Sequence, residues 1–265
     1  MEAKGDMTFW EHVDALRGVL LKGAALTLVL CVVLFAFMPT IFHSVILAPC
    51  RPDFPLYSLL RQLPALPGME GVTNVDSEVH LINIDLSAPL LLHFSTAFWM
   101  SILLALPALL GLAYSFIKPG LYAMERRYAR LGVATLAIMF YIGVAVGYML
   151  VFPLTLRFLA GYQVSVDVPN TISLASYMHT MMMLCLSMGL VFELPLAAWL
   201  LGKCGILHRE FFSCYRRHAV VILLLIAAII TPTSDPFTLM VVFLPVYMLW
   251  EAAALLVPRK TFSYE

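Results

Sequence analysis

Long runs of apolar residues, almost free of charge, constrain this chain more than any other feature. Because a helix rises 1.5 Å per residue, about 20 apolar residues cross the roughly 30 Å hydrocarbon core of a bilayer. Four segments reach that length: Val19–Pro39, Pro89–Ala113, Leu131–Leu156 and Leu174–Leu201. With 62% hydrophobic and only 12% charged residues, the chain is an integral membrane protein and not a soluble globular domain.

Two further apolar runs are short. Ala219–Thr231 is followed by the tight turn "TPTSDP" and then by Phe237–Val257, which Pro245 and Glu251 interrupt. We therefore predict an all-α membrane protein with six transmembrane helices, the fifth and sixth of them short. A short hairpin of this kind thins the bilayer around it through hydrophobic mismatch.

The distribution of Lys and Arg predicts the orientation. Six crossings place both termini on one side, and roughly thirteen basic residues lie in the segments on that side against three, Arg51, Arg61 and Arg157, on the other. The positive-inside rule then puts both termini in the cytoplasm. We predict one integral domain, 1–265, without internal repeats. It has a cytoplasmic amphipathic helix at 1–18, an outer cap loop at 41–88 and cytoplasmic loops at 114–130 and 202–218.

Several kinds of chemistry lack sequence support. The chain has an odd number of cysteines and no CxxC pair, which argues against a disulfide framework or a zinc site. "MHTMMML" around His179 is better explained as apolar packing than as a soft-metal site. No Gly-rich phosphate loop and no GxSxG motif occur, and the net charge is zero. We expect no metal, no cofactor, no nucleic-acid partner and no enzymatic activity.

One acid lies inside an apolar run. "SMGLVFELPLAAWLL" contains Glu193, and an acid near the bilayer centre usually marks a functional site. Pro195 removes a backbone hydrogen bond nearby and loosens the helix there. In its protonated form the carboxyl group could bond a partner helix or relay protons. The alternative is a hydrogen bond between helices of this chain, which contributes about 0.6 kcal/mol on average.

Further acids lie in the predicted cytoplasmic segments. "FWEHVDALRGVLL" reads as an amphipathic helix with Glu11 and Asp14 on one face, and "FIKPGLYAMERRYAR" contains Glu125 among arginines. The simple interpretation is an interfacial anchor and a weak surface ion pair. If the loop folds against the helix, the three acids form a patch that binds a pair of guanidinium groups. The residues alone leave both possibilities open.

Five sequence blocks, in order along the chain, resemble motifs of the TatC family, the multispanning core of the twin-arginine protein translocase. The blocks are "EHVDALRGVLL", "SFIKPGLYAMERR", "FYIGVAVGYMLVFPL", "VFELPL" and "ITPTSDPFTLMVVFLPVYMLWE". They run from Glu11 to Glu251 and so cover nearly the whole chain. The resemblance implies the family fold, with a concave groove in the membrane.

The resemblance also implies a binding site for Arg-Arg signal peptides on the cytoplasmic side. Glu125 matches the loop glutamate that contacts the arginines. Other positions that match this site are Phe116, Pro119, Leu121, Tyr122, Leu16 and Arg17. The second arginine-binding glutamate of the family falls at Ala15, so Asp14 or Glu11 substitutes for it or the site has a single strong acid.

Within the membrane, Glu193 matches the family position where a helix of a TatA/TatB-type partner docks. Thr231 and Asp235 match polar positions of the last hairpin, and Pro49 matches the outer-loop proline that follows the first helix. Pro195 has the structural role described above, that of loosening the helix beside Glu193. A glutamine usual in the last hairpin is replaced by Leu239, and the turn is about one residue longer than in some members.

The resemblance predicts the receptor and core subunit of a twin-arginine translocase in the bacterial cytoplasmic membrane. Engagement of a signal peptide at Glu125 would change which helix occupies the Glu193 site. TatA/TatB-type single-span proteins would then be recruited, and folded cargo would cross on the proton-motive force without ATP bound to this chain. We also expect several copies of the chain in the complex. The main alternative is a proton-coupled secondary transporter of a small solute, which commonly has repeated halves that this sequence lacks.

Overall fold

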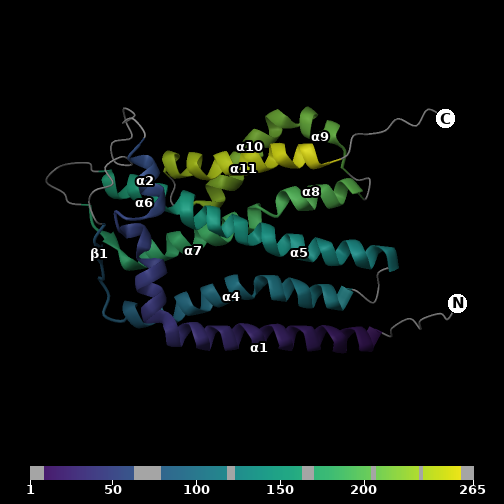
Figure 1. The fold of residues 1–265 in the computed structure, drawn as a ribbon, viewed down its shortest axis with the longest axis horizontal. Coiled ribbons are helices and arrows are strands. Elements are labelled where there is room, and N and C mark those ends of the chain that lie inside the picture. Colours follow the sequence, from purple (N-terminus) through teal and green to yellow (C-terminus); the bar gives the residue numbers. More distant parts are fainter. Residues whose placement is uncertain are drawn as a thin grey trace. The chain divides into compact units, whose positions relative to one another are not determined.

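The computed structural model describes residues 9–62, 79–117, 123–162, 170–203, 207–232 and 235–257, and these are almost entirely helical (Figure 1). The α-helices are α1 (Phe9–Ile41), α2 (Pro55–Leu60), α4 (Ala88–Ile117), α5 (Ala123–Val146), α6 (Phe152–Gly161), α7 (Leu174–Val191), α8 (Leu194–Lys203), α9 (Arg209–Cys214), α10 (Arg216–Ile230) and α11 (Pro236–Leu256). Shorter elements are the π-helices η1 (Phe42–Ile46) and η4 (Gly147–Val151), the 3-10 helix η2 (Ala48–Cys50), and strands β1 (Leu81–Ile82) and β2 (Ile172–Ser173).

Five helical stretches among the described residues are long and apolar enough to cross a membrane. They are Trp10–Leu60, Ala88–Phe116, Gly132–Gly161, Leu174–Lys203 and Pro236–Leu256. The remaining apolar helix, α10, has 15 residues, about 22 Å at 1.5 Å per residue, which is less than the hydrocarbon thickness. The chain is therefore a multi-pass helical membrane protein. Its sixth crossing and the cytoplasmic position of its termini stay predictions.

Two helices differ from the sequence expectation in length. α1 runs without a break for 33 residues from Phe9, so the amphipathic segment predicted at 1–18 continues directly into the first apolar run. α11 has 21 residues and is not short, because Pro245 is accommodated inside the helix. Proline is tolerated in membrane helices where neighbouring groups satisfy the freed carbonyl. The predicted cytoplasmic loop 114–130 includes the end of α4, which reaches Ile117, and the start of α5 at Ala123, and its cytoplasmic position stays a prediction.

The chain divides into two compact units, each described by itself. The first comprises Met1–Met38 and His93–Ala137. In it, the rings of Phe35 and His93 stack with centroids 4.2 Å apart, and His93 Nε2 lies 3.1 Å from the Phe35 carbonyl oxygen. Gly23 lets α1 approach α4 closely, because a Cβ there would lie 2.9 Å from Leu109 Cδ2.

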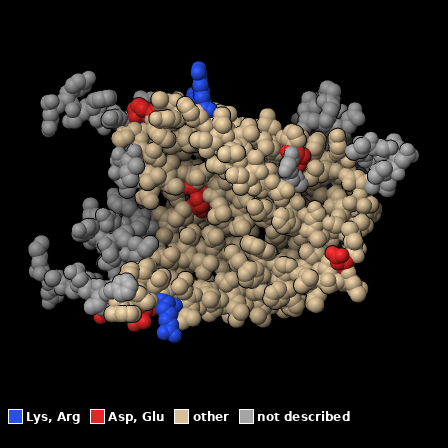
Figure 2. Space-filling view, turned by 180° about the vertical axis from the view of Figure 1, so that it is seen from behind, with Lys and Arg blue, Asp and Glu red and all other residues tan. Residues whose placement is uncertain are grey.

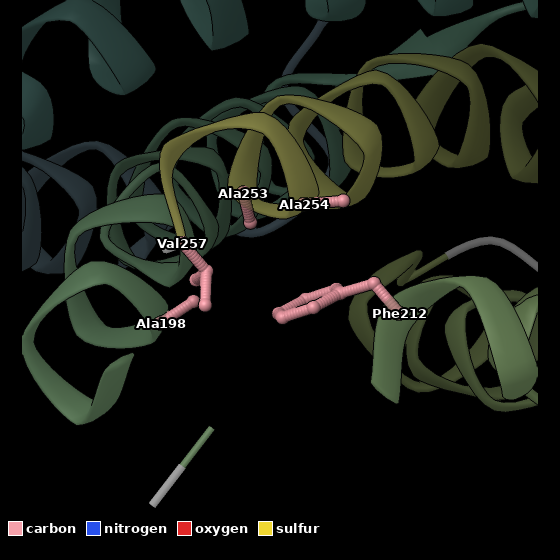
Figure 3. Packing of buried hydrophobic residues seen from close by; sticks show 5 residues of the cluster. All are labelled: Ala198, Phe212, Ala253, Ala254 and Val257. Carbon is pink, nitrogen blue, oxygen red and sulfur yellow. The ribbon is translucent and has the colours of Figure 1, made fainter. Parts of the chain in front are cut away.

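The second unit comprises Pro39–Leu92 and Ile138–Glu265. α11 packs against α8 and α10, and the stacked rings of Phe158 and Phe237, 4.0 Å between centroids, join α6 to the start of α11. Figure 3 shows Phe212 of α9 reaching toward Ala198 of α8 and Val257 after α11. A buried apolar cluster thus holds α8, α9 and α11 together, consisting of Ala198, Phe212, Ala253, Ala254 and Val257.

The loop 41–88, which is predicted to lie on the outer side, is folded over part of its length. After η1, η2 and α2, strand β1 pairs in parallel with β2, so that Leu81 faces Ile172 and Ile82 faces Ser173. Ser173 also caps α7, because its side chain accepts a hydrogen bond from the Ser176 N–H at 3.2 Å. The sheet thereby ties the outer loop to the start of α7.

The described surface is dominated by large apolar side chains. Leu28 on α1, Leu225 on α10 and Leu255 on α11 are all more than half exposed. Figure 2 shows a face on which charged side chains are sparse. Apolar side chains exposed on this scale are expected of helices whose solvent is lipid.

Candidate functional site

Glu193 lies at a break between two helices. α7 ends at Val191 and α8 begins at Leu194, with Pro195 in its first turn. Proline has no N–H to donate to the carbonyl four residues earlier, which here belongs to Val191, so the first helix ends at that point. The Ala197 N–H donates to the Glu193 carbonyl at 3.0 Å and starts the next helix. The loosening expected from "FELP" is therefore a two-residue turn, Phe192 and Glu193, within the helical stretch Leu174–Lys203.

The Glu193 carboxyl group is buried and faces α5. Neither of its oxygens makes a hydrogen bond with a described residue, although the group interacts with the backbone of Phe140. A buried polar group without a partner is costly, and such groups are rare in folded proteins. Among the described residues, this carboxyl is thus a strong candidate for a group reserved for something outside the chain.

A seam of glycines brings the backbones of α5 and α7 into contact beside this acid. A Cβ on Gly143 would lie 2.5 Å from the Met188 carbonyl oxygen, and one on Gly189 would lie 2.6 Å from the Phe140 ring. A Cβ on Gly147 would lie 3.0 Å from the Cys185 Cα. Close backbone approach through small residues is the usual basis of helix pairing in membranes. This seam is not among the predictions from the sequence, although the spacing of Gly143 and Gly147 in "GVAVG" indicates it.

The polar residues of the last hairpin lie at its turn. Asp235 caps α11, because its Oδ2 accepts a hydrogen bond from the Thr238 N–H at 2.7 Å. Its Oδ1 is buried and has no hydrogen-bond partner in the described part of the chain. Thr231 is buried at the end of α10. Asp235 therefore has a structural role of its own, and one carboxylate oxygen is left for another group.

The other end of the hairpin is closed by an ion pair. Arg216, the first residue of α10, lies 2.7 Å from Glu251 Oε2 near the end of α11, and the Tyr247 hydroxyl donates to Glu251 Oε1 at 3.0 Å. From the sequence, Arg216 is one of the roughly thirteen basic residues that indicate the orientation, and Glu251 is an interruption of the last apolar run. Their pairing could not be found from spacing, because 35 residues separate them.

The structure brings the N-terminal motif and the loop motif together at one contact. His12 of α1 and Phe116 near the end of α4 have ring centroids 4.5 Å apart. Glu11, Asp14 and Leu16 are exposed on α1 around His12, as is Arg17. Pro119, Leu121 and Tyr122 lie outside the described residues, and of Glu125 only the backbone, in the first turn of α5, is described. Whether the three acids form one patch stays a prediction.

Among the described residues, no three His, Cys, Asp or Glu side chains gather as ligands for a metal ion. His179 lies on α7, three of whose five methionines, Met178, Met181 and Met188, are buried in packing. The distinctive features of the described residues are therefore close contacts between helices and buried carboxyl groups.

Comparison with known proteins gives consistent matches. The family model "Sec-independent protein translocase protein (TatC)" matches residues 11–245. The Sec-independent protein translocase protein TatC of Blattabacterium is 28% identical over 94% of this chain and 94% of its own length. The protein of the same name from Escherichia coli K12 is 32% identical over 91% of this chain and 84% of its own length. A crystal structure described as the twin-arginine translocase receptor TatC superposes with a TM-score of 0.71 at 24% identity, covering 93% of this chain and 99% of that one.

Proposed function

The chain belongs to the TatC family of Sec-independent protein translocase proteins, and from this membership we propose that it is the receptor and core subunit of a twin-arginine translocase. As a family member it is a multi-pass membrane component of protein transport. Binding of Arg-Arg signal peptides, recruitment of partner subunits and location in the bacterial cytoplasmic membrane are the further parts of the proposal.

The first part is a receptor for two arginines. The observation that supports it most is the contact between His12 and Phe116, because it joins the two motifs that the family resemblance assigns to signal-peptide binding. Glu125 follows Phe116 at the start of α5, and Glu11 and Asp14 flank His12 along α1. A carboxylate binds a guanidinium group through charge-assisted, often bidentate hydrogen bonds, which favours Arg over Lys. Glu125 supplies the main carboxylate, with Asp14 or Glu11 in place of the acid absent at Ala15.

The second part is a docking site for a single-span partner of the TatA/TatB type. The buried Glu193 carboxyl group, without a hydrogen-bond partner among the described residues, supports this part. A polar side chain on the partner helix would satisfy the carboxyl group and hold an otherwise weak lipid-embedded contact in one register. Asp235 Oδ1 and Thr231 offer a further polar contact at the outer end of the hairpin.

Transport follows from coupling these two parts. Engagement of the signal peptide at Glu125 changes which partner helix occupies the Glu193 site and recruits TatA-type subunits. Folded cargo then crosses on the proton-motive force, with more than one copy of this chain in the active assembly. The 15-residue α10 supports this part, because a short helix thins the bilayer beside it.

Complementation tests the proposal in cells that lack their own TatC and carry a folded reporter with an Arg-Arg signal. The wild-type chain should restore export, and Glu125→Ala should abolish it. Glu210→Ala is a matched control, because Glu210 is an exposed acid of α9 outside the proposed sites. Export by Glu125→Ala at the level of Glu210→Ala would refute the receptor role. A wild-type chain that restores no export would refute the translocase function.

A further inference from the structure

A tight turn follows the end of α1. After Ile41 the chain passes through the π-helix η1 and the 3-10 helix η2, ending at Cys50. The last carbonyl groups of a helix have no partner inside it and must be satisfied by other groups. Within this turn the carbonyls of Val45, Ile46 and Pro49 accept hydrogen bonds from side chains.

Three tyrosines from three different elements supply those hydrogen bonds. The hydroxyl of Tyr57 in α2 donates to the Pro49 carbonyl at 2.6 Å, and that of Tyr148 in η4 donates to the Val45 carbonyl at 2.6 Å. The hydroxyl of Tyr177 in α7 donates to the Ile46 carbonyl. We call these three residues the tyrosine clamp. It also explains Pro49, whose buried carbonyl is held by one of the bonds.

Two members of the tyrosine clamp, Tyr57 and Tyr177, lie in a buried core. Tyr57 is 0% and Tyr177 2% exposed, and at such burial both the phenol and the carbonyl that it meets require a partner. The guanidinium group of Arg157, itself 2% exposed, lies 4.3 Å from the centroid of the Tyr57 ring. Packing against the Tyr57 ring therefore explains the position of Arg157, one of the three basic residues predicted on the outer side.

The same helices that carry the clamp also carry the glycine seam. η4 continues α5, which holds Gly143, and α7 holds Gly189. Along α7, Tyr177 lies near the beginning and Glu193 follows directly after the end. The clamp and the Glu193 carboxyl group therefore lie at opposite ends of one tightly packed helix pair.

We propose that Tyr57, Tyr148 and Tyr177 are positioning residues, whose hydroxyls fasten the outer turn of α1 to the α5–η4 and α7 helix pair and so fix how that pair presents Glu193. The consequence for partner docking rests on the proposed function. The clamp itself does not.

The first arm of the test measures the clamp in the full-length protein in lipid nanodiscs. Hydrogen exchange is followed for the amides of residues 42–51 in the wild type, Tyr148→Phe, Tyr177→Phe and Tyr162→Phe. The change to Phe removes one hydroxyl and keeps the ring, and Tyr162 is an exposed tyrosine outside the clamp. We expect about tenfold faster exchange in the two clamp variants, from the loss of one hydrogen bond, and wild-type exchange in Tyr162→Phe. Unchanged exchange in both clamp variants would overturn the proposal.

The second arm measures docking. A photo-crosslinking residue replaces Leu190, which is 53% exposed and three residues before Glu193, and its yield with a TatA/TatB-type partner is recorded. We expect the yield to fall severalfold in the clamp variants, while binding of an Arg-Arg signal peptide stays at the wild-type level and shows that the variants are folded. Faster exchange with an undiminished yield would overturn the positioning role. No crosslink even in the wild type would count against the proposed docking function, and the exchange arm would still decide the clamp.

Discussion

Gly143 and Gly189 bring two membrane helices into backbone contact: a Cβ on Gly143 would lie 2.8 Å from the Gly189 Cα. No side chain separates α5 from α7 at this level, so even a methyl group forces the helices apart. Because Glu193 follows Gly189 by only four residues, the seam also determines how its carboxyl group meets α5.

The first prediction concerns this seam. Gly143→Ala should destabilise the protein by about 1–3 kcal/mol, the usual cost of overpacking a tight contact, and lower the melting temperature in detergent. Gly132→Ala is the matched control in the same helix, since a Cβ there meets nothing within 4 Å. At that open position alanine should be neutral or stabilising by up to about 1 kcal/mol. Equal melting temperatures for the two variants would contradict the seam.

The second prediction concerns the cap of α11. Asp235→Ala removes the acceptor of the Thr238 N–H and should cost about 1 kcal/mol, whereas Asp235→Ser keeps an acceptor and most of the stability. Thermal unfolding of both variants measures the difference. If Asp235→Ser proves as unstable as Asp235→Ala, the capping role is wrong. If Asp235→Ser is stable and yet fails in export, the buried Oδ1 is the functional atom.

The third prediction concerns the ion pair between Arg216 and Glu251. Both side chains are partly exposed, and exposed pairs contribute about 0.2–1 kcal/mol. A double-mutant cycle with Arg216→Gln and Glu251→Gln should give a coupling energy in that range. Glu251→Gln keeps an oxygen that can accept the hydrogen bond from Tyr247, so the cycle reports on the charge interaction and not on that bond. A coupling energy of zero would mean that the pair contributes nothing to closing the hairpin.

The fourth prediction concerns Glu193. If its carboxyl group bonds a partner helix, Glu193→Gln should keep much of the crosslink yield with a TatA/TatB-type partner, because an amide also donates and accepts hydrogen bonds. Glu193→Leu should lose the crosslink, although leucine is compatible with a lipid-facing helix, because its side chain forms no hydrogen bond with the partner. Equal yields from wild type and Glu193→Leu would remove the docking role.

Much of the architecture could be predicted from the sequence, because hydropathy and proline position act locally. The apolar runs locate α4, α7 and α11, and Pro195 explains why α7 ends at Val191. Helix lengths were harder to predict from the sequence. No local sequence signal marks the point where an amphipathic segment passes into a membrane span, so the sequence predicts two pieces where α1 is continuous. Pro245 was read as an interruption because tertiary packing, which accommodates it, leaves no local signal.

The contacts of the candidate site depended more on tertiary structure. The resemblance located Glu193 and Phe116 by motif, but their neighbours, Phe140 and His12, come from helices distant in sequence. The tyrosine clamp is a similar case, because Tyr177 meets the Ile46 carbonyl across 131 positions. Such pairings carry no periodic signal in a single sequence.

Direct binding of a signal peptide tests the central claim most sharply. Affinities of the purified full-length protein are compared for an Arg-Arg signal peptide and the same peptide with Lys-Lys, in the wild type, Glu125→Ala and Glu210→Ala. We predict that the wild type and Glu210→Ala bind the Arg-Arg peptide about tenfold or more tightly than the Lys-Lys peptide, because the Lys-Lys peptide loses one bidentate charged pair. Glu125→Ala should bind the two peptides with equal affinity. A preference for Arg-Arg that survives Glu125→Ala unchanged would contradict the account of this chain as a receptor that reads two arginines through that acid.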